Sequence, residues 1–137
     1  MKTKNNVGFT VIELLITLIV IGVVFLSFTI TYTGVQNIGK KSTDVALAST
    51  AAFSKLQEYE NESFPNLPAT TPTGTLQQVE DFSSSLPSVL EKPAIGIVYV
   101  NTVSTTLKQV VIKVSYGAGS THYIEYDTFI QAHGVGQ

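Results

Sequence analysis

The sequence predicts an α+β protein in which a long N-terminal α-helix packs on a small C-terminal antiparallel β-sheet. Three observations lead to this fold class: an apolar run over residues 9–30, a helical stripe of apolar residues that follows it, and alternating apolar residues in the last third. The chain has 137 residues, which is enough for one small domain behind the apolar run.

The apolar run reads FTVIELLITLIVIGVVFLSFTI and contains a single charge, Glu13. As a helix it measures about 33 Å, close to the thickness of a bilayer core. A secretory signal peptide has a shorter apolar region and then a small-x-small cleavage site, which residues 31–36 do not offer. The domain behind the run is too small to surround it as a core helix. We therefore expect a membrane-spanning segment.

Glu13 is the informative residue of this run. A carboxylate inside an apolar span costs about 2.5–3.5 kcal/mol and usually has a partner. Two interpretations stay open on physical grounds: Glu13 is paired within the membrane, or it lies near the headgroups and remains solvated. A plain membrane anchor explains the length of the run but not the charge.

Basic residues give the orientation of the span. Lys2 and Lys4 precede it, whereas Lys40 and Lys41 follow at a distance. The positive-inside rule favours a cytoplasmic N-terminus and a C-terminal domain outside the cytoplasmic membrane.

The segment Gly8-Phe9-Thr10-Val11-Ile12-Glu13-Leu14-Leu15 resembles the cleavage and methylation motif of type IV prepilins. A short leader with lysines precedes it and an unbroken apolar run follows, so the resemblance is specific over about the first 30 residues. It implies that residues 1–8 are a leader, removed by a prepilin peptidase between Gly8 and Phe9. It also implies N-methylation of the Phe9 amine, and pairing of Glu13 with the Phe9 amine of a neighbouring subunit during assembly.

The family resemblance implies a structural subunit of a type IV pilus, or of a related type II secretion or DNA-uptake filament. Abundant pilins of the best-known class often carry a proline at the position of Ile30, and this chain has none before Pro65. This favours a minor pilin or pseudopilin. The alternatives are a pilus-associated adhesin or DNA-binding component, and a single-span anchored domain that never polymerises. A net charge of −2 gives no support for a nucleic-acid partner.

The soluble half of the helix is expected over residues 31–61. Val45, Ala48, Ala52, Leu56 and Tyr59 form one apolar stripe, and Lys40, Asp44, Lys55 and Glu58 lie on the opposite face. Two helices broken near residues 34–39, where Gly34 and Gly39 lie, are the alternative.

The remaining chain divides into a connection and a sheet. Residues 62–93 are rich in proline and predict a variable loop, with a possible short helix over 76–86. Residues 94–137 predict the antiparallel sheet, with strands over 95–101, 108–116 and 122–130 and a turn at 117–119.

Four residues invite a metal-site interpretation: His122, Glu125, Asp127 and His133. Alternation along a strand places His122 on the face opposite to Glu125 and Asp127, which argues against a shared ion. The chain has no cysteine, phosphate loop, nucleophile elbow or pair of zinc ligands. We therefore expect no enzymatic activity, metal, cofactor or small-molecule substrate.

Overall fold

The computed structural model describes residues 9–68, 70 and 74–132. The fold is α+β, as predicted: one long α-helix, α1 (Val11–Asn61), followed by four strands and three short 3₁₀ turns. The helix is continuous through the glycines at 34 and 39, so the alternative of two helices is wrong. The chain divides into two compact units at Lys40/Lys41.

The first unit, as far as it is described, is the N-terminal part of α1. Every residue from Phe9 to Lys40 is exposed. Ile30 is helical like its neighbours, as expected for a sequence without proline there.

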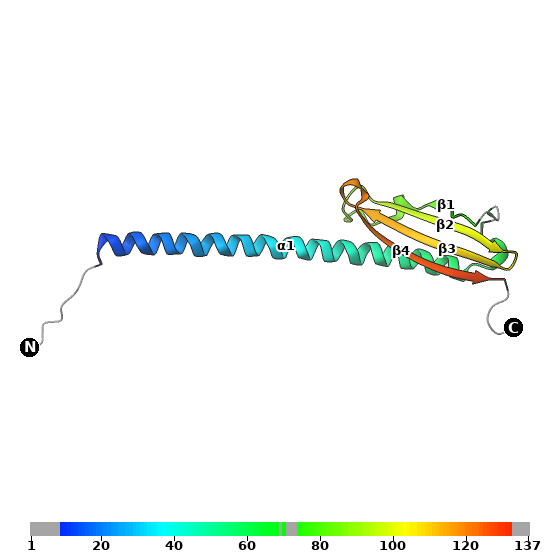
Figure 1. The fold of residues 1–137 in the computed structure, drawn as a ribbon, viewed down its shortest axis with the longest axis horizontal. Coiled ribbons are helices and arrows are strands. Elements are labelled where there is room, and N and C mark those ends of the chain that lie inside the picture. The colour runs from blue at the N-terminus through cyan, green and yellow to red at the C-terminus, as the bar shows by residue number, and fades with distance from the viewer. Residues whose placement is uncertain (1–8, 69, 71–73, 133–137) are drawn as a thin grey trace, which may run out of the picture. The chain divides into compact units, whose positions relative to one another are not determined.

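The second unit is a four-stranded antiparallel sheet that packs against residues 41–61 of α1. The strands are β1 (Gln77–Asp81), β2 (Ile95–Ser104), β3 (Leu107–Tyr116) and β4 (His122–Gln131), in the order β1-β2-β3-β4. Figure 1 shows β1 and β4 at the two edges. The turn between β3 and β4 uses Gly117 and Gly119 at positive φ, which glycine adopts without steric cost.

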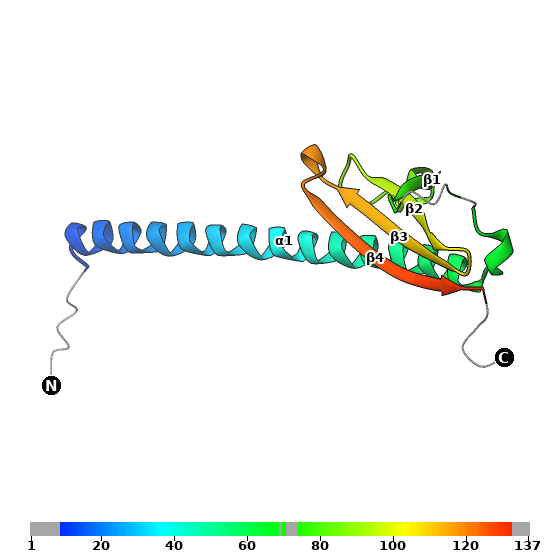
Figure 2. The same ribbon diagram turned by 45° about the vertical axis from the view of Figure 1, so that its right-hand side comes forward.

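The core of this unit lies between the helix and one face of the sheet (Figure 2). The helix contributes Ala48, Ala52, Leu56 and Tyr59, in agreement with the predicted stripe. The sheet contributes every second residue of its central strands, among them Val98, Val100, Val110, Ile112 and Val114. This alternation agrees with the sequence pattern of residues 108–116, whereas residues 95–101 are apolar at nearly every position in the sequence.

The predicted stripe and polar face of α1 are wrong at three positions. Val45 is 46% exposed, so it does not belong to the stripe. Asp44 is only 2% exposed, and its Oδ2 has no hydrogen-bond partner among the described residues. Lys55 is also largely covered, because it lies over the rings of Tyr59 and Phe82 and pairs with acidic residues.

The predicted short helix over residues 76–86 is also wrong. Residues 77–81 form strand β1, and only Ser83–Ser85 form a 3₁₀ turn. The register of β1 against β2 shifts between Gln78 and Glu80. This bulge interrupts the period-two pattern by which a strand is recognised in a sequence.

Candidate functional site

The residues that the sequence predicted for cleavage and assembly lie at or just before the start of α1. Gly8, on the leader side of the proposed cleavage, lies outside the described residues, whereas Phe9 is described and is 80% exposed. Glu13 lies in the first turn of α1. A carboxylate is stabilised there by the partial positive charge of the free backbone N–H groups.

Thr10 and Glu13 form a reciprocal cap at this helix end. The backbone N–H of Glu13 donates to Thr10 Oγ1 (3.3 Å), and the backbone N–H of Thr10 donates to Glu13 Oε2 (3.3 Å). The Thr10 hydroxyl also donates to Glu13 Oε2 (3.2 Å). Thr10 precedes the first helical residue and Glu13 is the third, so the pair is a capping box.

Thr10 was not predicted to be the N-cap of this helix, although the sequence contains a signal for it. A threonine followed three residues later by glutamate, just before an apolar run, is the sequence signature of a capping box. The cap gives Glu13 hydrogen-bond donors within its own chain. Glu13 Oε2 thus has hydrogen-bond donors without any contact to a second subunit.

The apolar side chains that follow Glu13 are not covered by the rest of the described chain. This part of α1 is strongly apolar, and every residue from Phe9 to Lys40 is exposed. Among the described residues, α1 is the one helix long and apolar enough to cross a membrane. A large exposed apolar surface of this kind, uncovered by any described residue, is compatible with insertion into a membrane.

The hydroxyl groups of this segment are satisfied within the helix. Thr17, Ser27, Thr29 and Thr31 each donate to the carbonyl oxygen four residues earlier, at 2.7–3.0 Å. Thr33 likewise donates to the carbonyl oxygen of Thr29 at 3.1 Å. A hydroxyl paired in this way needs no water, so it carries little cost in hydrocarbon.

A second polar group joins the helix to strand β1. Lys55 Nζ lies 2.7 Å from Glu80 Oε1 and 3.0 Å from Glu58 Oε2, and the Tyr59 hydroxyl donates to Glu80 Oε2 at 2.7 Å. Burial lowers the pKa of Lys55, but hydrogen bonds and charge from Glu80 and Glu58 outweigh it, and the pKa is raised. Burial works to raise the pKa of Glu80, yet Lys55 and Tyr59 hold it below its ordinary value. These contacts tie α1 to strand β1.

The four residues considered for a metal do not come together. The ring of His122 lies 5.6 Å from that of Tyr116, on the face opposite to Glu125 and Asp127, as alternation predicted. His133 lies outside the described residues. Within the described part of the chain, no group of three or more metal-ligating side chains could hold an ion.

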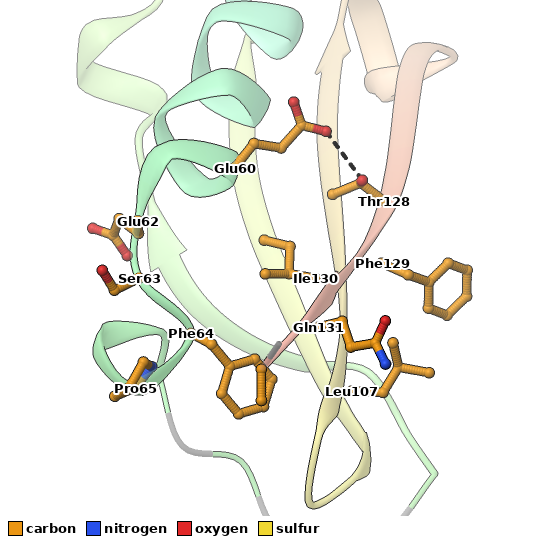
Figure 3. A pocket seen from close by; sticks show the side chains of 11 residues that line it. Glu60, Glu62, Ser63, Phe64, Pro65, Leu107, Thr128, Phe129, Ile130 and Gln131 are labelled. Atoms are coloured by element: carbon orange, nitrogen blue, oxygen red, sulfur yellow. Dashed lines mark hydrogen bonds between the residues drawn. The ribbon is translucent and has the colours of Figure 1, made fainter. Parts of the chain in front are cut away.

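A cavity with a volume of about 620 Å³ lies between the end of α1 and β4 in the second unit (Figure 3). Glu60 and Glu62 line it from the helix side, and Thr128 Oγ1 donates to Glu60 Oε1 across it (3.0 Å). Phe64, Ile130 and Gln131 complete its floor and wall. The cavity is an open, acidic groove.

Comparison with protein-family models, with curated proteins and with solved structures finds no match to this chain.

Proposed function

We propose that the chain is a prepilin-like structural subunit, a minor pilin or pseudopilin, that assembles into a type IV pilus or a related secretion or DNA-uptake filament. The observation that carries the proposal is Glu13, the one charge within residues 9–30, an exposed apolar segment of membrane length. It stands five residues after Gly8, in a segment that resembles the prepilin motif.

Processing comes first in this proposal. A prepilin peptidase cuts between Gly8 and Phe9 on the cytoplasmic side, and the new Phe9 amine is N-methylated. The lysines of the leader keep the N-terminus inside, so the C-terminal domain lies outside the cytoplasmic membrane. The exposed apolar side chains from Phe9 onward hold the subunit in lipid until it assembles.

Assembly then replaces lipid with neighbouring helices. The new amine at Phe9 and the carboxylate of Glu13 both leave water as subunits pack, and each offsets the other's desolvation when they pair between subunits. An uncompensated partner costs about 3–5 kcal/mol, so a wrong register between helices is penalised. The pair therefore fixes the register of the subunits along the filament.

The minor pilin or pseudopilin assignment rests on the absence of proline at Ile30. The helix runs through this position without a break, whereas a proline there would kink it.

The mass of the membrane-extracted protein tests the proposal. We expect an N-terminus at Phe9 that carries one added methyl group. A Gly8→Arg variant is the control, because a long charged side chain at the cleavage site prevents close approach of the peptidase to the backbone. A native protein that keeps Met1 and residues 2–8 would refute the proposal.

One observation favours a second candidate, a membrane-anchored domain that never polymerises. The capping box supplies Glu13 with a hydrogen-bond partner in its own chain, so a second subunit is not required to explain the carboxylate. Sedimentation of sheared surface material decides between the two, because an anchored domain stays in the membrane fraction.

A further inference from the structure

We infer that strand β4 is an open docking edge that accepts an extended, lysine-rich segment of another polypeptide as a fifth strand of the sheet. The inference rests on the second unit alone and does not depend on the proposed pilin function.

The two edges of the sheet differ. Edge strand β1 has five residues and a register shift, and a short, bulged strand is a poor template for pairing. Edge strand β4 has ten residues in unbroken register with β3 and contains neither proline nor lysine. By length and regularity, β4 is the edge open to strand addition.

The register shows which backbone groups of β4 are free. The N–H of Ala132 donates to the carbonyl of Thr106 (2.9 Å), so these two residues form a hydrogen-bonded pair of the antiparallel ladder. Such pairs alternate with non-bonded ones along the strands. Every odd-numbered residue from Tyr123 to Gln131 therefore directs its N–H and C=O away from β3. Among the described residues, no group hydrogen-bonds to this outer row.

The acidic side chains next to the free backbone groups of β4 indicate which kind of peptide would bind there. Asp127 has no ion-pair partner among the described residues, and Glu125 has only Lys113, at 3.9 Å. The groove on the other side of the edge is lined by Glu60 and Glu62 and by no basic side chain of the described chain (Figure 3). Carboxylates thus flank both faces of the open edge, and a strand that carries lysines complements them.

A second copy of the chain is a poor occupant. Pairing β4 with another β4 brings Glu125 and Asp127 of both copies into one ladder, and like charges on facing strands destabilise the pair. Pairing β4 with β1 of a second copy has the same defect, because β1 carries Glu80 and Asp81. The acidic edge thus works against self-association while it admits a basic strand.

A peptide-binding experiment on the full chain in nonionic detergent micelles tests the inference. The probe is a fluorescent peptide of about nine residues, with lysine and threonine alternating and both ends blocked. Two further peptides carry N-methyl groups on alternate residues, one set along each edge of the strand. We expect the first peptide to bind, and methylation of one edge to weaken it about tenfold while methylation of the other does not, because only one edge donates to β4.

Two variants at Asp127 test whether the backbone of β4 hydrogen-bonds to the peptide. Asp127→Pro removes an N–H of the outer row, whereas Asp127→Asn removes the charge and keeps that N–H. We expect Asp127→Pro to bind more weakly than Asp127→Asn. If Asp127→Pro does not fold, the two methylated peptides still decide.

Four outcomes would overturn the inference. They are no binding of the lysine peptide, equal binding of a glutamate-for-lysine peptide, equal binding of the two methylated peptides, and concentration-dependent dimers of the chain that Asp127→Pro abolishes. The third outcome means charge attraction without strand pairing, and the last assigns the edge to a second copy.

Discussion

Thr10 and Glu13 exchange hydrogen bonds across the first turn of α1, so the carboxylate proposed for contact between subunits already caps its own helix. Both roles use the same side chain, but they need different properties of it. Capping needs a hydrogen-bond acceptor, which an amide oxygen also supplies, whereas pairing with an amine needs the negative charge. Substitutions at the two positions therefore separate the roles.

Glu13→Gln keeps an acceptor for the cap and loses the charge. If assembly uses a charge pair with the Phe9 amine, we expect this variant to be cleaved and methylated normally but to be scarce in sheared filaments. Glu13→Ala should behave in the same way. Immunoblots of the sheared and membrane fractions measure the distribution, and wild-type amounts of Glu13→Gln in filaments would exclude the charge pair.

Thr10→Ala is the matched control for the cap. It loses the threonine hydroxyl and keeps the carboxylate, at a cost of about 1 kcal/mol in helix stability. We expect it to enter filaments nearly as well as the wild type, since the bilayer and neighbouring helices stabilise α1 independently of its cap. If Thr10→Ala fails as completely as Glu13→Gln, the cap rather than the charge governs assembly.

Glu80 makes the stability of the second unit depend on pH. Its folded-state pKa is lowered from 4.5, against the effect of burial, by Lys55 and Tyr59. A lowered pKa stabilises the fold above the unfolded-state value, and this contribution is lost as the pH falls through the folded-state value. The free energy of unfolding should therefore differ between wild type and Glu80→Gln at neutral pH, by about 1 kcal/mol for a carboxylate that is 36% exposed.

Below the ordinary pKa of Glu80 that difference should shrink. Urea unfolding of both forms, followed by near-ultraviolet circular dichroism of the tyrosines at several pH values, measures it. Lys55 gives the opposite dependence, because its pKa is raised from 10.5 and its contribution is lost only as the pH rises through the folded-state value. A difference that stayed constant into acid would show that Glu80 does not act through its charge.

The sheet was readable from the sequence where burial is one-sided. Strands predicted over 95–101, 108–116 and 122–130 are found over 95–104, 107–116 and 122–131. The apolar residues of 108–116 and 122–130 alternate because one face packs on the core, whereas residues 95–101 were recognised as a nearly continuous apolar run. Strand β1 was not readable, since QQVED is polar and its one apolar residue lies at the bulge.

The burial of individual α1 side chains depends on tertiary contacts, so it could not be predicted from the sequence either. The apolar stripe followed from spacing, but the burial of Asp44 depends on how the sheet covers that turn, and spacing does not report this. Lys55 was assigned by spacing to the face opposite the stripe, but it is covered because it pairs with Glu80, which lies on the strand that was not predicted. At the start of α1, Glu13 was interpreted only through its charge, and its hydrogen-bond partner Thr10 was not predicted.

Lys108 fixes the loop that follows α1. It is 8% exposed, and its Nζ donates to the carbonyl oxygens of Leu67 (2.9 Å) and Phe64 (3.3 Å) while lying 4.7 Å from the Phe64 ring centre. Lys108→Met keeps most of the packing volume but leaves two carbonyls without this donor. We expect a loss of about 1–3 kcal/mol in the free energy of unfolding.

Lys108→Arg is the control for that substitution, because it keeps a cation and hydrogen-bond donors. It should retain more stability than Lys108→Met in the same urea titration. Faster proteolysis between residues 62 and 76 in Lys108→Met would show that the loop has been released. Equal stability of the two variants would mean that only the aliphatic part of the side chain matters.

Gly96 provides the space that Phe82 occupies over strand β2. A Cβ at position 96 would lie 2.8 Å from Cε2 and Cζ of the Phe82 ring. The two residues are also linked by a hydrogen bond from the Phe82 N–H to the Gly96 carbonyl (2.9 Å), so the ring is held close to the strand. Gly96→Ala should therefore lower the free energy of unfolding by about 1–3 kcal/mol, as overpacking of a core does.

The double variant Gly96→Ala/Phe82→Leu makes room for the added methyl group, so the cost of Gly96→Ala should be smaller in the Phe82→Leu background than in the wild type. A double-mutant cycle measured by thermal denaturation would give this coupling, and purely additive effects would show that the ring does not oppose the methyl group.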